Sequence, residues 1–188
     1  MLDATRTAAT RPMTPLTAAL MADYNRWMNE RLYEAAAGLP EAELARDRGA
    51  FFGSILQTLN HVVVADCIWL HRFAGQPDAA ELRLALAGIP LPTSLREEMA
   101  GSLAALHERR RELDELTRRW AGALTAEQLE APLTYRNMAG RSFRRNFGHL
   151  VLHFFNHQTH HRGQASTLLF QAGVDIGVTD LLAVIPEA

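Results

Sequence analysis

The sequence predicts an all-α protein: a four-helix bundle with a short hairpin or ordered loop before its last long helix. The chain has 188 residues, of which 48% are hydrophobic and 21% are charged, enough for one domain with a sizeable core. Four stretches carry apolar residues at helical spacing between residues that start or stop helices. Four long amphipathic helices in a chain of this size are typical of a bundle. The predicted helices span 16–37, 54–74, 94–122 and 146–172.

The first two predicted helices have clear start and stop signals. Thr14 followed by Pro15 is a typical helix start, with threonine as the N-cap and proline at the first helical position. Gly38 ends this helix, because glycine is favoured just past a helical C-terminus. The second helix is expected to begin near Ser54 and to stop at Gly75.

The third helix follows a connection that is rich in proline. Residues 76–92 contain three prolines, and we expect them to form a connection with room for one short helix. The next helix is expected to start at Thr93 or Ser94, since both residues are good N-caps. Arginines and glutamates interleave within 108–115, which indicates a solvated face on this helix.

The segment before the fourth helix breaks the helical pattern. Residues 133–145 contain the turn-like run Asn137-Met138-Ala139-Gly140, and a short hairpin or ordered loop fits them better than a helix. The fourth helix is expected to stop at Gly173, and Thr179 with Asp180 is expected to start one last short helix.

The chain is expected to form one domain. It contains no repeat, no low-complexity tract and no stretch that resembles an interdomain linker. Residues 1–13 are small, polar and interrupted by arginine, so we expect a flexible N-terminal tail there. Residues 14–188 are then expected to form a single helical domain.

Composition disfavours several classes of function. With 19 basic and 21 acidic residues the net charge is −2, which disfavours a domain built mainly to hold nucleic acid. No apolar run approaches the roughly 20 residues that a membrane span needs, and the N-terminus lacks the apolar core of a signal peptide. Cys67 is the single cysteine, which excludes an internal disulfide. We expect a cytoplasmic protein with no nucleic-acid or membrane partner.

Histidine is the unusual residue of this chain. Five of the eight histidines lie within residues 149–161. Residues four apart on a helix project from nearly the same face, so His157 and His161 can point both rings at one metal ion. His153 and His157 have the same spacing, however, and spacing alone does not choose between the two pairs. The alternative interpretation is a polar, solvated helix face.

A third metal ligand is expected from another helix. His61 is the best candidate, because it lies in the middle of the second predicted helix within an apolar stretch. A lone histidine in such a place is more often an ordinary core residue. Asp66 and Arg162 are candidates for a buried pair or for substrate binding, against the more common role of a surface or structural ion pair.

Three of the predicted helices carry motifs of one family. The motifs are Tyr24, Trp27 and Asn29 with Leu39-Pro40 for the first helix, Phe51 to Ile55, Leu59 to His61, Asp66, Trp69 and Arg72 for the second, and the run Asn156 to Gln164 for the fourth, which is the most specific. They resemble DinB-like (YfiT-related) proteins, and the likeness covers about residues 16–185.

The resemblance implies a four-helix bundle with one divalent-metal site. Carried over residue by residue, the implied ligands are His61, His157 and His161, and this choice leaves His149 and His153 outside the ligand set. It also implies a homodimer. Better-understood relatives include transferases and isomerases that depend on low-molecular-weight thiols, while the family name is no sign of DNA binding.

Three imidazoles leave at least one position open on a divalent ion, which is typical of catalytic rather than structural sites. Zinc is the default metal, with nickel, copper, iron or manganese as alternatives. Gln164 and Asn60 are candidates to hold the second nitrogen of the ligating rings, or are ordinary polar residues at a helix seam.

The leading interpretation is a divalent-metal-dependent enzyme with a small-molecule substrate, a transferase or isomerase that uses a low-molecular-weight thiol. The sequence identifies no catalytic residue beyond the ligands. The alternatives are a non-catalytic metal-binding or sensing protein with the same three histidines, and a plain bundle that acts through a partner surface.

Overall fold

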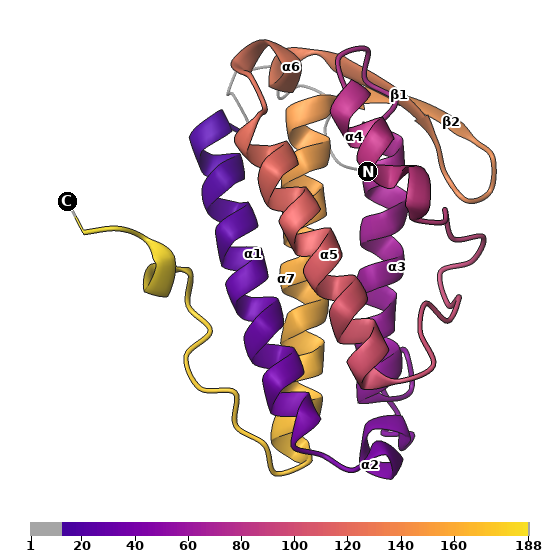
Figure 1. The fold of residues 1–188 in the computed structure, drawn as a ribbon, viewed down its shortest axis with the longest axis vertical. Helices are drawn as coiled ribbons and strands as arrows, with labels where there is room; N and C mark the ends of the chain where they lie inside the picture. The colour runs from indigo at the N-terminus through magenta and orange to yellow at the C-terminus, as the bar shows by residue number, and fades with distance from the viewer. Residues whose placement is uncertain (1–12, 188) are drawn as a thin grey trace, which may run out of the picture.

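Four long helices pack side by side in the computed structural model, which describes residues 13–187 (Figure 1). α1 packs against α5 and α7, and α3 packs against the same two helices. The core between them is apolar and includes large side chains from all four. The predicted all-α bundle is therefore confirmed. The four helices are α1 (Pro15–Ala37), α3 (Ile55–Phe73), α5 (Leu103–Gly122) and α7 (Phe147–Gln171).

The predicted starts of two helices are confirmed by their caps. The Thr14 side chain accepts a hydrogen bond from the backbone N–H of Thr17 (3.1 Å), and Pro15 is the first helical residue. The Ser54 side chain accepts from the backbone N–H of Gln57 (3.1 Å). Each cap satisfies a backbone donor that a helix start leaves without a partner.

The predicted start of the third helix is wrong: α5 begins at Leu103, after an N-cap at Ser102. The Asn60 side chain holds the preceding chain in a non-helical path, because its amide donates to the carbonyl of Glu97 (2.7 Å) and its oxygen accepts from the N–H of Met99 (2.8 Å). Those two backbone groups are thus bonded to α3 rather than within a helix.

This connection runs the length of the bundle. α3 and α5 point in the same direction, so the chain must return along the bundle before α5 can begin (Figure 1). Residues 89–102 make that return with no helix or strand. Their course brings Leu95 and Arg96 beside α3.

Short elements complete the fold. The predicted hairpin is confirmed, with Leu133 paired to Arg145 and Tyr135 to Phe143. Its turn needs Gly140, whose φ of 77° is costly for other residues. The short helices predicted after Pro77 and at Thr179 are present, whereas α2 and α6 were not predicted. The short elements are α2 (Glu41–Ala45), α4 (Ala80–Ala85), η1 (Leu86–Gly88), α6 (Ala126–Glu130), β1 (Pro132–Arg136), β2 (Ser142–Asn146) and η2 (Leu181–Val184).

The N-terminal tail predicted for residues 1–13 lies outside the described residues except for Met13, which is buried in the core. Among residues 13–187, no helix is both long enough and apolar enough to cross a membrane.

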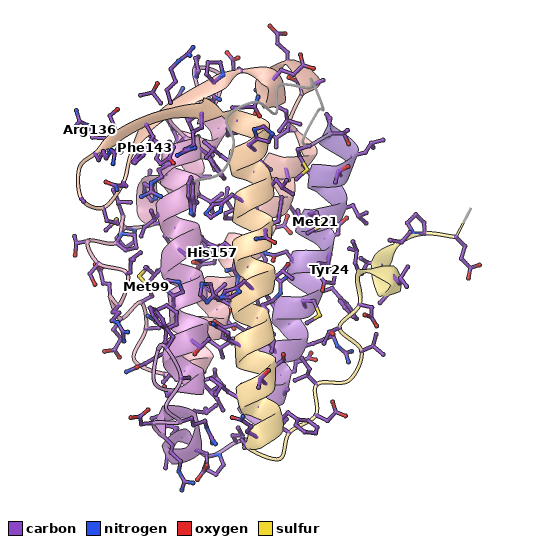
Figure 2. The ribbon with its side chains drawn as sticks, turned by 180° about the vertical axis from the view of Figure 1, so that it is seen from behind. Met21, Tyr24, Met99, Arg136, Phe143 and His157 are labelled. Carbon is purple, nitrogen blue, oxygen red and sulfur yellow. The ribbon has the colours of Figure 1, made fainter. Side chains whose placement is uncertain are left out.

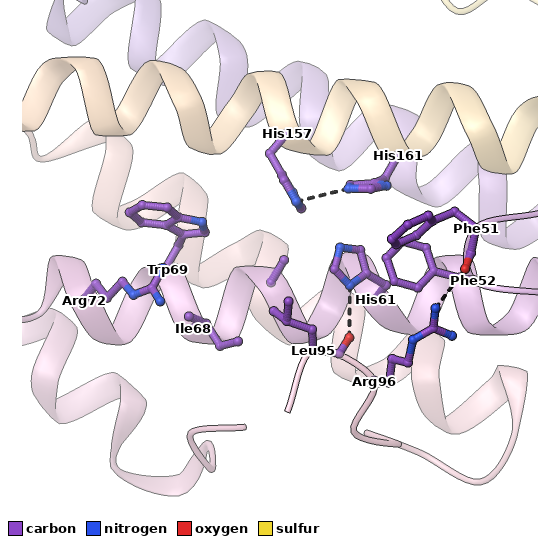
Figure 3. A pocket seen from close by; sticks show the side chains of 11 residues that line it. Phe51, Phe52, His61, Ile68, Trp69, Arg72, Leu95, Arg96, His157 and His161 are labelled. Atoms are coloured by element: carbon purple, nitrogen blue, oxygen red, sulfur yellow. Dashed lines mark hydrogen bonds between the residues drawn. The ribbon is translucent and has the colours of Figure 1, made fainter. Parts of the chain in front are cut away.

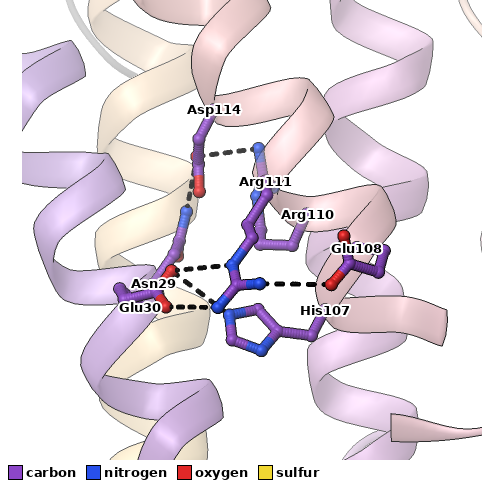
Figure 4. Close-up of polar contacts among 7 residues, drawn as sticks. All are labelled: Asn29, Glu30, His107, Glu108, Arg110, Arg111 and Asp114. Carbon is purple, nitrogen blue, oxygen red and sulfur yellow. Dashed lines mark hydrogen bonds and ion pairs between the residues drawn. The ribbon is translucent and has the colours of Figure 1, made fainter. Parts of the chain in front are cut away.

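Polar side chains of α1 and α5 contact one another (Figure 4). Near the surface, Arg111 donates to Glu30 (2.8 Å), and the His107 ring lies 3.2 Å from the same carboxylate. Deeper in the bundle, the Asn29 amide donates to Asp114 (2.9 Å). The partly exposed pairs contribute little stability each, whereas the buried contact belongs to a larger network.

Candidate metal centre

Three histidines converge between α3 and α7 (Figure 3). One ring nitrogen of each of His61, His157 and His161 lies within 4.8 Å of the other two. The Nε2 atoms of His157 and His161 are 3.1 Å apart. Bonds of 2.0–2.1 Å from one ion place neighbouring nitrogens about 2.9–3.4 Å apart at tetrahedral or octahedral angles. The spacing of this pair therefore fits two ligands on one ion.

Hydrogen bonds orient two of the three rings. Nδ1 of His61 donates to the backbone carbonyl of Leu95 (3.1 Å), and Nδ1 of His161 donates to the side-chain oxygen of Gln164 (2.8 Å). A neutral imidazole with a proton on Nδ1 carries its lone pair on Nε2. Both rings thus carry a lone pair on Nε2, as a metal ligand must, and in His161 this nitrogen faces Nε2 of His157.

The rings are also held in the neutral form that metal binding requires. Burial lowers the pKa of His61 to about 4 and that of His157 to about 3. Burial also lowers the pKa of His161, against the opposing effect of its hydrogen bond to Gln164. Three neutral nitrogen donors at pH 7 are a suitable set for zinc and for the later divalent transition metals.

The histidines line a pocket of about 350 Å³. Phe52 stacks on the His61 ring with centroids 3.9 Å apart, and the apolar wall continues along α3. Arginines stand toward its two ends, Arg72 on α3 and Arg96 on the long connection (Figure 3). No Asp or Glu is among the lining residues. The pocket therefore combines nitrogen donors, an apolar wall and positive charge.

The remaining histidines of α7 lie outside this group. His149 is exposed in the first turn, and His153 packs its ring edge against Trp69 at 5.0 Å. His160 is exposed; its ring packs edge-on against that of His161 and its Nε2 faces the Gln164 amide, so it directs no nitrogen into the group. Of the two pairs that spacing left open, the structure brings His157 and His161 together with His61.

The two candidate supporting residues have different roles. Gln164 contacts a ring directly, as described. Asn60 contacts no ring of the three; instead it fixes the connection that carries Leu95. The Leu95 carbonyl was missed by the sequence analysis, because a backbone oxygen on a loop leaves no signal in residue type.

A second buried polar group has members on all four long helices. We call it the carboxylate–guanidinium network: Asn25, Asn29, Asp66, Arg110, Asp114, Gln158 and Arg162. Figure 2 shows Tyr24 of α1 on one side of α7 and His157 on the other, toward α3.

The network corrects two sequence interpretations. Asp66 does not pair with Arg162; it accepts hydrogen bonds from Arg110 (2.5 Å) and from Gln158 (2.6 Å). Arg162 donates to Asn25 instead. Arg110 also pairs with Asp114 (3.0 Å) and is 1% exposed, so it does not belong to a solvated face.

Three comparisons relate this chain to known proteins. The family model described as "DinB family" matches residues 9–187. The curated protein named "Protein DinB" from Bacillus subtilis (strain 168) is 28% identical over 159 residues, which cover 84% of this chain and 87% of that protein. The crystal structure of a DinB-like protein from Bacillus cereus ATCC 10987 matches with a TM-score of 0.47 and 18% identity, over 81% of this chain and 90% of that one.

Proposed function

This chain belongs to the DinB family, and we propose that it is a divalent-metal-dependent enzyme, a transferase or isomerase that uses a low-molecular-weight thiol. The observation that carries the proposal is the convergence of three neutral imidazoles on the wall of an accessible pocket. His61, His157 and His161 are the proposed ligands. A divalent ion bound there, by default zinc, would supply a Lewis acid that stabilises a thiolate.

The protein's own side chains orient the histidine rings and exclude water from the pocket. Leu95 and Gln164 fix the two rings whose Nδ1 atoms they bind. Phe52, Ile68 and Trp69 give the pocket an apolar wall, which lowers the local dielectric and strengthens polar interactions inside. The substrate class is a small molecule, because a space of about 350 Å³ is at the lower end of small-ligand sites.

The alternative function is non-catalytic metal binding or sensing. One observation favours it: among the described residues that line the pocket there is no carboxylate, hydroxyl or thiol side chain to act as a general acid or base beside the histidines. The enzyme and the sensor would use the same metal site, but only the enzyme would turn over a substrate.

Metal titration and a turnover assay test the proposal in sequence. Calorimetric titration of metal-free protein with zinc should give one site per chain, and His161→Ala should lose it. Zinc-loaded protein should then accelerate the transfer of a small thiol to an electrophilic dye, beyond zinc-loaded buffer and the His161→Ala variant. One bound zinc without such acceleration across a panel of thiols would favour the sensing function.

We also propose that the chain works as a homodimer in the cytoplasm. Large apolar side chains are exposed on α1 and on the C-terminal segment, among them Leu16, Val178 and Leu182. Cys67 is buried as a free thiol, which suits a reducing compartment. Light scattering should give twice the chain mass of 20.9 kDa; the mass of one chain at high concentration would contradict the dimer.

A further inference from the structure

Arg72 stands in the pocket without an acidic partner. Its guanidinium lies between two aromatic rings, 4.6 Å from the centroid of Trp69 and 5.3 Å from that of Tyr135. Within residues 13–187 no carboxylate pairs with it, in contrast to Arg110 and Arg111, which are both in ion pairs. Half-buried and without a counterion, it is a charge that a bound anion would compensate.

Arg96, toward the other end of the pocket, already has a hydrogen-bond acceptor within the protein. It donates to the backbone carbonyl of Phe51 (2.9 Å) and lies over the rings of Phe51 and Phe52. It is also exposed to solvent. The two arginines therefore differ: Arg96 braces the wall of the pocket, while the N–H groups of Arg72 have no acceptor among the described residues.

The distance from Arg72 to the histidines sets the length of a ligand. Eleven residues separate His61 from Arg72 along α3, an axial rise of about 16 Å. Helical side chains lean toward the N-terminus, and Figure 3 shows Arg72 reaching along α3 toward Trp69. The His61 ring leans the same way, so only the greater length of the arginine side chain shortens the separation, to on the order of 10 Å. Ala65 and Ile68 line the space between them.

We propose that Arg72 binds the carboxylate of the substrate and so selects an amphipathic small acid whose other end reaches His61, His157 and His161. This inference rests on the proposed function, in which that other end is a thiol. The planar guanidinium matches a carboxylate through two parallel hydrogen bonds. Of the two arginines among the described lining residues, only Arg72 lies toward that end of the pocket, and a single guanidinium suits a singly charged carboxylate better than a phosphate dianion.

Binding to metal-free protein tests this role separately from the metal. The probes are hexanoate, the neutral hexanamide and hexyl phosphate, with affinity followed by calorimetry and by tryptophan fluorescence, to which Trp69 of the pocket contributes. We expect hexanoate to bind at least about 10-fold more tightly than hexanamide, because charged hydrogen bonds are among the stronger ones. Arg72→Gln should abolish that preference and leave hexanamide binding unchanged, which would show that the pocket is intact.

Two further variants complete the test. Arg96→Gln should keep the preference for hexanoate, and Arg72→Lys should keep part of it, since lysine retains the charge without the planar geometry. Equal affinity for hexanoate and hexanamide, or a preference that survives Arg72→Gln, would overturn the inference. Tighter binding of hexyl phosphate than of hexanoate would overturn the choice of carboxylate. A failure of zinc binding, measured separately, would instead overturn the proposed function.

Discussion

Two buried polar groups share α7, and their partners differ. The three histidines turn ring nitrogens toward one another beside a pocket, and the outer nitrogens of His61 and His161 are held by Leu95 and Gln164. In the carboxylate–guanidinium network, by contrast, Asp66 and Asp114 both receive their cationic partner, Arg110, from within the bundle. The first group is arranged for a ligand from outside, whereas the carboxylates of the second find their cation within the bundle.

The contrast shows how one helix serves two purposes. His157 and Gln158 are adjacent, and adjacent residues project about 100° apart on a helix. His157 therefore lies on the side of the pocket, while Gln158 is fully buried and donates to Asp66. Burial and polarity alone do not distinguish a functional group from a structural one. The distinction lies in whether the protein itself supplies the partners.

The largest expected effect is on the network. Arg110→Met should lower the free energy of unfolding by about 3–5 kcal/mol, because it leaves the Asp66 and Asp114 carboxylates buried without their cation. Urea denaturation measures the loss. Arg109→Ala is the matched control, since it removes only a partly exposed pair with Glu112 and should cost under about 1 kcal/mol. If both variants lowered the free energy of unfolding by a similar small amount, the buried network would not contribute more to stability than a surface ion pair.

Removing one proposed ligand should affect metal binding rather than folding. We expect His161→Ala to weaken zinc binding by more than about 100-fold, beyond the effect of residues that only orient a ligand. His160→Ala is the control, because that ring is adjacent in sequence but exposed; it should change zinc affinity by less than about 3-fold. Competition titration against a chromogenic chelator measures both. The reverse outcome would refute the assignment of the three histidines.

Gln164 should have an intermediate effect on the same site. Gln164→Leu removes the acceptor for Nδ1–H of His161 and should weaken zinc binding by about 10–100-fold. Gln164→Glu keeps an acceptor and should restore most of the affinity. If leucine and glutamate gave equal affinity, the hydrogen bond would have no part in binding metal.

The last expected effect is a pH dependence of stability. Burial raises the pKa of Asp66 to about 6 from an ordinary 3.8, and Arg110 opposes the rise. The folded protein therefore holds this proton more tightly than the unfolded chain does. The contribution of the Asp66 proton to the stability of the fold is complete below pH 3.8, the ordinary pKa, and declines as the pH rises through about 6.

A comparison of wild type with Asp66→Asn isolates the pH-dependent contribution of Asp66 to stability, because asparagine does not titrate. The difference in unfolding free energy, wild type minus variant, should fall between about pH 4 and pH 7. A difference that rises over this range would mean that the pairing with Arg110 outweighs burial.

Much of the fold followed from local signals. Thr14, Pro15 and Ser54 marked helix starts, and the run that ends at Gly140 marked the hairpin turn, because caps and turns depend on the residues that form them. The start of α5 was placed too early for the opposite reason. Ser94 is a good N-cap locally, but Asn60, from a distant part of the chain, takes up the backbone groups that a helix there would use.

The sequence by itself determined that this chain forms a helical bundle and that histidines four residues apart share a face of its last long helix. Both properties are set by helical periodicity. Spacing left open which histidines meet, and only the family resemblance implied His61, His157 and His161. Only the tertiary structure decided which backbone carbonyl orients His61 and that Arg72 enters the pocket with no carboxylate partner among residues 13–187. Those outcomes depend on how α3, α7 and the long connection pack together, and contacts between segments far apart in the chain leave no pattern within either one.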